Sequence, residues 1–177
     1  HRDLHSFPTR RSSDLHPVAI LLTHGHFDHV MAVDSVRAAY HIPVYAAEAE
    51  KETMHDASIN LSINMGGAML SIEADHWLKD GETITLLDQE VRCILTPGHT
   101  VGGMCFYFPK AGMLFSGDTL FQESVGRTDF PGGSMSEIVR SIREKLFVLP
   151  DAVQVYPGHG LMTSIKNEKM FNPFAVE

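Results

Sequence analysis

A run of metal-ligand side chains follows directly after a short apolar segment near the start of the chain. The apolar segment, residues 17–22, has the length and composition of a buried strand. The run that follows it contributes His24, His26, Asp28 and His29. So much polarity at the edge of a core is costly unless the groups are paired or bound to metal. The sequence therefore predicts a fold in which a strand end presents a metal site.

The spacing within this run predicts which of its side chains can share a metal ion. Residues i and i+2 of an extended segment project to the same side, so His24 and His26 can share one metal ion. Asp28 and His29 come one step later, at the predicted turn into a helix, and can face a neighbouring position. Imidazole and carboxylate groups suit zinc, and also iron or manganese, better than softer metals.

Three later segments repeat the pattern of a buried strand that ends in a turn with a ligand. Residues 91–96 lead to His99 in a Pro-Gly-His-Thr turn, residues 113–116 lead to Asp118 in Gly-Asp-Thr, and residues 153–156 lead to His159 in Pro-Gly-His-Gly. The glycines allow sharp turns and a close approach to a crowded centre. If these strands are neighbours, seven ligands converge at one edge of the sheets, which is enough for two metal ions.

The composition is that of one globular domain. The chain has 177 residues, of which 44% are apolar and 20% charged, a balance typical of soluble proteins. The net charge of −8 argues against a nucleic-acid or anionic-membrane partner. We expect a cytoplasmic protein in which Cys93 and Cys105 are reduced, buried thiols, with a disulfide between them as the alternative.

The remaining periodicity predicts alternating strands and helices. Helical spacing covers residues 30–40, 48–55 and 136–147, and a terminal helix is predicted with Thr163 as its cap. Further strands are predicted at 43–46, 83–87 and 103–108, with a hairpin turn at Asp88-Gln89. Residues 57–75 have no clear period and are interpreted as a loop or lid over the site. This order predicts an α+β fold of layered sheets with helices outside.

The first residues, 1–15, are interpreted separately. The stretch HRDLHSFPTRRSSDL has neither secondary-structure periodicity nor the apolar core of a secretory signal. Residues 5–15 can be encoded by the arm of a short-read sequencing adapter, so we interpret residues 1–15 as a translated artefact. An arginine- and serine-rich disordered tail is the alternative. The domain is then residues 16–177, and we expect it to lack its N-terminal strands.

The HxHxDH run and the PGHT, GDT and PGHG turns, in this order over residues 17–177, resemble the metallo-β-lactamase superfamily. The resemblance implies an αββα sandwich with the site at one edge. It also implies a ligand set: His24, His26 and His99 for a first metal, Asp28, His29 and His159 for a second, and Asp118 as the bridge. Several strands normally precede the HxHxDH run in this family, and here that portion is absent.

Within the superfamily, the residue at position 118 separates subgroups. The β-lactamases of the commoner zinc subclasses have cysteine there, whereas Asp118 resembles glyoxalase II, persulfide dioxygenases and related hydrolases. Four segments resemble the small bacterial glyoxalase II-like (hydroxyacylglutathione hydrolase-like) group: residues 120–121, 126–130, 131–133 and 172–174. The chain stops before the C-terminal helical domain that helps large glyoxalase II enzymes bind glutathione, so the thiol specificity stays open.

This resemblance implies a metal-dependent hydrolase that cleaves a small thioester such as S-D-lactoylglutathione to a 2-hydroxy acid and a free thiol. A hydroxide that bridges two metal ions, most simply zinc with iron or manganese as alternatives, would attack the carbonyl. Asp28 and Asp118 are the predicted catalytic residues, because they would orient that hydroxide. Phe121, Arg127 and Lys166 are the predicted substrate contacts. For Arg127, an ion pair with Asp129 that braces its loop is an equal alternative.

Three other functions stay open at the level of the sequence. A persulfide dioxygenase-like enzyme would use one iron and share the motifs. Another hydrolase on the same scaffold would act on lactones or phosphodiesters. The third is non-enzymatic: a fragment that cannot fold, or a metal-binding remnant without activity. Among the enzymes, fold alone does not choose the substrate.

Overall fold

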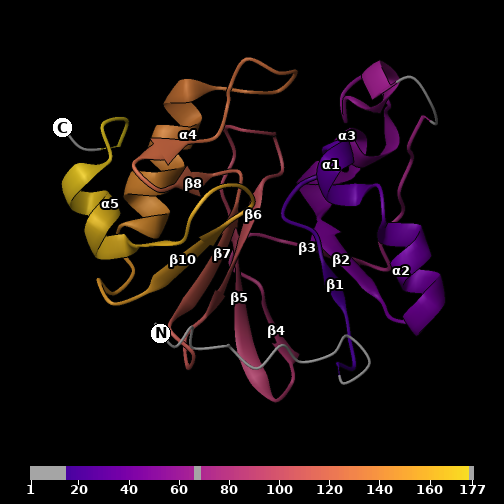
Figure 1. The fold of residues 1–177 in the computed structure, drawn as a ribbon, viewed down its shortest axis with the longest axis horizontal. Coiled ribbons are helices and arrows are strands. Elements are labelled where there is room, and N and C mark those ends of the chain that lie inside the picture. Colours follow the sequence, from indigo (N-terminus) through magenta and orange to yellow (C-terminus); the bar gives the residue numbers. More distant parts are fainter. Residues whose placement is uncertain (1–14, 66–68, 176–177) are drawn as a thin grey trace, which may run out of the picture.

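The structure is a computed structural model that describes residues 15–65 and 69–175. It has four layers, with helices on the outer face of each of two sheets that pack against one another (Figure 1). The predicted α+β class and αββα sandwich are confirmed. The interpretation of residues 1–15 concerns a segment that, apart from Leu15, lies outside the described residues.

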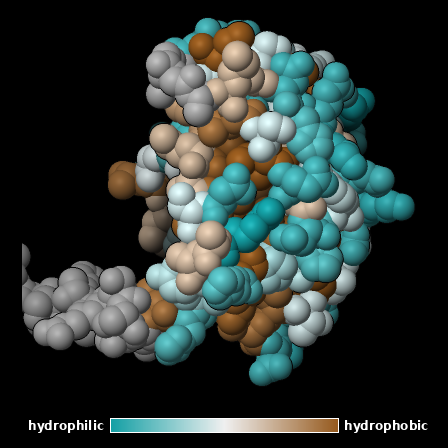
Figure 2. Space-filling model, turned by 90° about the vertical axis from the view of Figure 1, so that its right-hand side faces the viewer, coloured by the Kyte–Doolittle hydropathy of each residue, from teal (hydrophilic) through white to brown (hydrophobic). Residues whose placement is uncertain are grey.

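The smaller sheet has three parallel strands in the order β1-β2-β3. They are β1 (Ile20–Leu21), β2 (Val44–Ala47) and β3 (His76–Leu78). Its outer face is covered by α1 (Phe27–Val30), α2 (Val33–Tyr40), η2 (Glu48–Glu50) and α3 (Lys51–His55), with η3 (Ser62–Met65) further along the chain. The core between these helices and the sheet includes Val30, Val44 and Met54, all fully buried. Hydrophilic side chains cover much of this helical face, with hydrophobic ones between them (Figure 2), as expected of amphipathic helices on a sheet.

The larger sheet has six strands in the order β11-β10-β7-β6-β5-β4. They are β4 (Thr83–Leu86), β5 (Gln89–Leu95), β6 (Met104–Phe108), β7 (Met113–Gly117), β10 (Gln154–Pro157) and β11 (Thr163–Ser164). Strands β4 to β7 form an antiparallel meander, and β10 pairs with β7 in parallel. The outer face is covered by α4 (Met135–Ser141), η4 (Ile142–Leu146) and α5 (Ile165–Phe171), and a hairpin of β8 (Leu120–Phe121) and β9 (Ser124–Val125) follows β7.

Strand β6 lies between two apolar cores. Its sequence MCFYF is buried on both faces, which is why it reads as a continuous apolar run instead of an alternating one. Met104 and Phe106 pack with Val91 of β5 and with the smaller sheet. Cys105 and Tyr107 point the other way, toward the helices α4 and α5.

The strand directions bring all the ligand turns to one edge of the sandwich. Strands β5, β7 and β10 run in the same direction, so their C-terminal ends lie on the same side of the larger sheet. The end of β1 joins them, because the carbonyl of Thr23 accepts a hydrogen bond of 2.8 Å from the amide of Met104 at the start of β6. The ends of β1, β5, β7 and β10, which carry the four ligand turns, therefore lie at the same edge of the sandwich, where the site was expected.

Several predicted boundaries are wrong by one to three residues. The helix predicted at 30–40 is divided into α1 and α2, with Met31 and Ala32 between them. The hairpin turn is Leu87-Asp88 instead of Asp88-Gln89, since Leu86 pairs with Gln89. Strands β3, β8, β9 and β11 were not predicted. Of the predicted lid, residues 57–75, part forms η3 and residues 66–68 lie outside the described range.

The predicted state of the cysteines is confirmed, because Cys93 and Cys105 are both buried and free. Burial raises the pKa of each thiol to about 11. Within the described part of the chain, no helix is long and apolar enough to cross a bilayer.

Candidate metal centre

The first ligand turn lies between β1 and α1 (Figure 1). His26 has extended backbone angles, with φ −63° and ψ 146°, and is the N-cap of α1. Asp28 and His29 lie within α1. The predicted change from extended backbone to helix inside this run is confirmed, and it places Asp28 and His29 in α1 while His24 and His26 precede that helix.

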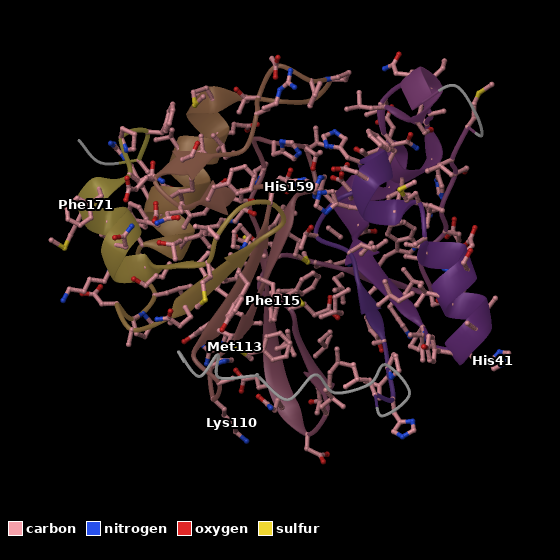
Figure 3. All side chains as sticks on the ribbon, viewed as in Figure 1. His41, Lys110, Met113, Phe115, His159 and Phe171 are labelled. Carbon is pink, nitrogen blue, oxygen red and sulfur yellow. The ribbon has the colours of Figure 1, made fainter. Side chains whose placement is uncertain are left out.

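The other ligands follow three strands of the larger sheet. His99 comes after β5, Asp118 after β7 and His159 after β10. The last two turns are held together by a backbone hydrogen bond of 2.8 Å from the amide of Gly158 to the carbonyl of Gly117. Figure 3 shows His159 at the upper edge of the sheets, where the two halves of the sandwich meet.

The ligand atoms lie close enough to share metal ions. His26 Nδ1 is 2.9 Å from His99 Nε2, and His29 Nε2 is 3.2 Å from His159 Nε2. Asp118 lies between these pairs, with Oδ1 3.4 Å from His29 Nε2 and Oδ2 3.6 Å from His99 Nε2. Two ligands of a tetrahedral zinc with bonds of 2.0–2.1 Å are separated by roughly 3.3 Å. The observed separations therefore match those of ligands around a common ion.

Three sets of side chains in the described ranges bring their ligand atoms within 4.8 Å of one another. They are His24, His26 and His99; His24, His29 and Asp118; and Asp28, His29 and His159. The first and third sets are the groups that the family resemblance implies for two metals. The second set contains Asp118, the implied bridge. The structure thus brings all seven predicted ligands into one cluster.

Unpaired polar atoms indicate that the cluster fits a cation. Among the described side chains, His24 Nε2, His26 Nε2 and Asp118 Oδ1 are buried and have no hydrogen-bond partner. Each such atom costs about 1–3 kcal/mol if it stays unsatisfied. A divalent metal would satisfy His24 Nε2 and Asp118 Oδ1, since neutral imidazole and carboxylate are its usual donors. His26 faces His99 through its other ring nitrogen, Nδ1.

Hydrogen bonds from the protein orient two of the histidines. His99 donates its Nδ1 proton to the backbone carbonyl of Arg127 at 2.7 Å, and a carbonyl can only accept. The unprotonated Nε2 of His99 is therefore the atom that faces Asp118 and His26. His24 Nδ1 lies 3.2 Å from the hydroxyl of Thr23. Partners of this kind set ring orientation and tautomer in metal sites.

Burial favours the neutral form of the histidines, which is the form that binds metal. It lowers the pKa of His24 well below its usual value, and it lowers that of His26 to about 4, in each case with help from neighbouring histidines. The pKa of His29 is lowered by burial too, and that of Asp118 is raised by burial. Histidines with lowered pKa values are neutral at pH 7 and can ligate.

A cleft of about 360 Å³ opens over the ligands. This volume lies within the usual range for small-molecule sites, near its lower end. Besides the ligands, its walls are formed by largely apolar side chains together with one guanidinium: Phe27, Leu61, Phe121, Arg127 and Phe130. The arrangement offers a cluster of candidate metal ligands at the floor and an apolar wall around it.

The predicted substrate residues have different positions. Phe121 and Arg127 line the cleft. Arg127 also forms the alternative ion pair, with Nη2 2.8 Å from Asp129 Oδ2, and its guanidinium lies over the ring of Phe130 at 4.3 Å. Lys166 lies on α5 and is not among the described residues that line the cleft.

Sequence reasoning missed three cleft residues. Phe27 and Phe130 lie inside the motifs that were recognised, so their positions next to ligands were a usable signal. Leu61 has φ 69°, a left-handed conformation that is rare for leucine, and nothing in the local sequence indicates its place at the site.

The chain is similar over most of its length to bacterial hydrolases. It is 40% identical to the protein named "Probable metallo-hydrolase YqgX" of Bacillus subtilis, over 93% of this chain and 78% of that protein. It is 34% identical to hydroxyacylglutathione hydrolase GloC of Haemophilus influenzae, over 91% of this chain and 77% of the relative.

Several solved structures are also similar to this chain. BLEG-1, a B3 metallo-beta-lactamase, superposes with a TM-score of 0.87 at 41% identity, over 93% of this chain and 80% of that one. TTHA1623 in a di-iron-bound form gives 0.80 at 35% identity, over 92% and 80%. ETHE1 from Myxococcus xanthus gives 0.73 at 29% identity, over 92% and 65%. The sequence profile of the metallo-beta-lactamase superfamily matches residues 8–159. This chain is therefore a metallo-hydrolase of the metallo-beta-lactamase superfamily.

Proposed function

We propose that the chain hydrolyses a small thioester, of the class of S-D-lactoylglutathione, to a 2-hydroxy acid and a free thiol. The observation that carries the proposal is the position of Asp118, whose carboxylate lies within 3.6 Å of ligands from both predicted metal groups. Such a carboxylate suits a dinuclear site, and the similarity to the hydrolase GloC supports a hydroxyacyl thioester as the substrate.

The cluster fits two divalent ions, for which zinc is our first choice. Iron is the alternative, since TTHA1623 has been seen in a di-iron-bound form. His24, His26 and His99 would hold one ion, Asp28, His29 and His159 the other, and Asp118 would contact both. When bound, such ions lower the pKa of water toward neutrality and polarise a carbonyl.

The two aspartates then have separate tasks. Asp28 is partly exposed and lines the cleft, with Oδ2 3.2 Å from His159 Nε2, so besides serving as a ligand it could orient the attacking water. Asp118 is more deeply buried, and its carboxylate lies between His29, His99 and His159 at the bottom of the cleft, where it would keep these ligands in place. Attack on the thioester carbon forms a C–O bond and breaks the C–S bond. The thiolate leaves without a general acid, because a thiol with a pKa near ~8.5 is a good leaving group.

The cleft suits a small acyl group on a larger thiol. Phe27, Leu61, Phe121 and Phe130 form apolar walls that would hold the acyl chain and the sulfur. Arg127 is 66% exposed at the cleft, which leaves its guanidinium able to meet a carboxylate of the thiol portion. Its existing pair with Asp129 is solvent-exposed, and such a pair is weak enough to rearrange.

The test is hydrolysis of S-D-lactoylglutathione by the purified chain loaded with zinc, iron or manganese in turn. We expect metal-dependent release of free thiol that is lost in His99→Ala. Because His99 is held by the 126–130 loop as well as by the cluster, the folded state of the variant is checked by circular dichroism. Absence of turnover in a folded protein that binds two metals per chain would refute the thioesterase proposal.

A second candidate is β-lactam hydrolysis, which the 41% identity to the B3 metallo-beta-lactamase BLEG-1 favours. A β-lactam, a lactone and a phosphodiester are therefore assayed beside the thioester, with the same His99→Ala control. Oxygen consumption with a persulfide, together with one iron per chain, would instead identify the dioxygenase-like alternative. The substrate with the highest kcat/KM assigns the function.

A further inference from the structure

A buried carboxylate contacts the two turns that carry His24, His26 and His99. Glu50, in η2, is 1% exposed. Its Oε1 accepts a hydrogen bond of 2.9 Å from the backbone amide of Gly25. Its Oε2 accepts one of 2.9 Å from the hydroxyl of Thr100 and one of 2.7 Å from the backbone amide of Gly102.

These partners belong to the two separate ligand turns. Gly25 lies between His24 and His26, and Thr100 directly follows His99. The two turns come from different sheets of the sandwich, one after β1 and one after β5. Glu50 thus links them from a third element that supplies no ligand itself.

Only a carboxylate can make all of these contacts. The amides of Gly25 and Gly102 are obligatory donors, so each of the two oxygens of Glu50 has to accept. A glutamine at this position would turn its NH₂ group toward at least one N–H donor. A charge-assisted bond to an amide is also about twice as strong as a neutral one.

Glycines allow the helical segment to lie directly on both turns. A Cβ atom at Gly102 would fall 2.3 Å from the backbone nitrogen of Glu50. A Cβ atom at Gly25 would fall 2.8 Å from the side chain of Met54 in α3. The two turns and the η2–α3 segment therefore pack backbone to backbone around the Glu50 carboxylate.

We propose that Glu50 is a positioning residue that sets the metal affinity of the group formed by His24, His26 and His99. By holding the Gly25 and Thr100 backbones at a fixed separation, it fixes how far the first two histidines lie from the third. Partners of metal ligands typically change metal affinity by about 10- to 100-fold. The inference rests on the metal cluster and is independent of which substrate is hydrolysed.

Glu168 provides a matched control. It is fully buried, like Glu50, and it too accepts hydrogen bonds from a backbone amide and a threonine hydroxyl, those of Glu123 and Thr163. It joins α5 to the turn between β8 and β9, and its hydrogen-bond partners lie outside both ligand turns. Glu168→Gln therefore reports the cost of altering a buried carboxylate without altering the histidines.

The experiment compares zinc affinity in wild type, Glu50→Gln and Glu168→Gln by competition with a chromophoric chelator, at a temperature where circular dichroism shows all three folded. We expect Glu50→Gln to bind one zinc equivalent roughly 10- to 100-fold more weakly. The visible spectrum of the cobalt-loaded variant should shift as well, because the histidine geometry changes. Glu168→Gln should lower only the melting temperature. Equal affinity in all three proteins, or equal losses in both variants, would overturn the proposal.

A second pair of variants covers the case in which Glu50→Gln does not fold. Thr100→Val removes the hydroxyl that donates to Glu50 and keeps the side-chain shape, whereas Thr100→Ser keeps the hydroxyl. We expect Thr100→Val to weaken zinc binding by roughly 10-fold, the lower end of the range, and Thr100→Ser to restore it. Identical zinc affinities and cobalt spectra for the two variants would show that Glu50 does not position the ligands.

Discussion

Gly158 illustrates how a single residue controls the space around the ligands. A Cβ atom at this position would lie 2.3 Å from Asp118 Oδ1 and 2.8 Å from His29 Cε1. Both neighbours are predicted ligands, and Gly158 itself lies on an exposed turn. The need for glycine here comes from the site and not from the core.

We predict that Gly158→Ala lowers metal affinity at least about 10-fold while changing the free energy of unfolding of the metal-free protein by less than about 1 kcal/mol. The added methyl would displace the Asp118 carboxylate or the His29 ring. Metal affinity is measured by chelator competition and stability by urea unfolding. Leu161→Ala, which shortens a side chain that is 72% exposed on the following loop, is the control and should change neither quantity. Wild-type affinity in Gly158→Ala would contradict the prediction.

Among individual residues, the candidate metal ligands could be predicted from the sequence more readily than the residues that contact them or line the cleft. His24 and His26 could be assigned to one metal because their relation depends only on local extended backbone. Glu50 was not singled out, since its partners Gly25 and Gly102 lie 25 and 52 residues away in the sequence. Lys166 was predicted as a substrate contact from its charge alone, and its place on α5 depends on how that helix packs.

Among the elements, the β4–β5 hairpin has a turn whose residues do not suit its backbone. Leu87 and Asp88 have φ 52° and 58°, so both occupy the left-handed region. A two-residue hairpin turn with two positive φ angles favours Asn-Gly. Leu87 is 69% exposed, so its side chain contributes little to the core.

We predict that the double variant Leu87→Asn, Asp88→Gly raises the free energy of unfolding by about 1 kcal/mol, because these residues tolerate the left-handed backbone. Urea unfolding of the metal-free protein measures the change. Leu87→Ala is the control: it removes the same side chain but introduces neither asparagine at position 87 nor glycine at position 88, so no comparable gain is expected. Equal stability of the control and the double variant would rule out the backbone explanation.

An ion pair joins the turn before β4 to η4 and to the end of β5. Asp80 Oδ2 lies 2.7 Å from Lys145 Nζ, and Asp80 Oδ1 accepts a hydrogen bond of 2.9 Å from the amide of Leu95. Partial burial acts to raise the pKa of Asp80, but these contacts outweigh it and leave the pKa below its usual value. The unfolded chain therefore binds more protons than the folded one near the usual pKa of ~4.

We predict that Asp80→Asn is less stable than wild type by up to about 1 kcal/mol at pH 7, because the pair is partly exposed. Since the pKa is lowered in the folded state, this contribution is complete above pH ~4 and is lost as the pH falls through the folded-state value. Urea unfolding of both metal-free proteins at pH 7 and at pH 3 tests this. A stability difference that stays constant or grows toward low pH would contradict the assignment.

Element boundaries show where local signals compete. Thr163 was predicted to cap the last helix, but Ser164 is the cap and accepts from the amide of Asn167. Thr163 pairs with β10 instead, and its hydroxyl donates to Glu168. The adjacent hydroxyl residues offer the same local capping chemistry, and only the strand pairing decides between them. Strand β3 was missed for a similar reason, because His76–Leu78 gains its strand character from pairing with β2.

For the whole molecule, the metal cluster lies across the junction of the two sheets. One half supplies His24, His26, Asp28 and His29, and the other half supplies His99, Asp118 and His159. Strand order and periodicity predicted layered sheets with helices outside, and the family resemblance implied the αββα sandwich. A metal ion bound between the two halves interacts with both of them in the folded state. The unfolded chain has no such site.

We therefore predict that metal removal lowers the melting temperature of the whole chain in a single transition. A ligand at 100 times its Kd stabilises a protein by about 2.7 kcal/mol, which for a domain of this size corresponds to a shift of roughly 5–11 °C. Differential scanning calorimetry before and after dialysis against a chelator measures the shift, and added zinc should reverse it. In Asp118→Asn the shift should be smaller, because this residue contacts histidines from both halves. If the metal acted within one half only, chelation would instead separate the unfolding into two transitions, and the view of the cluster as a link between the sheets would be wrong.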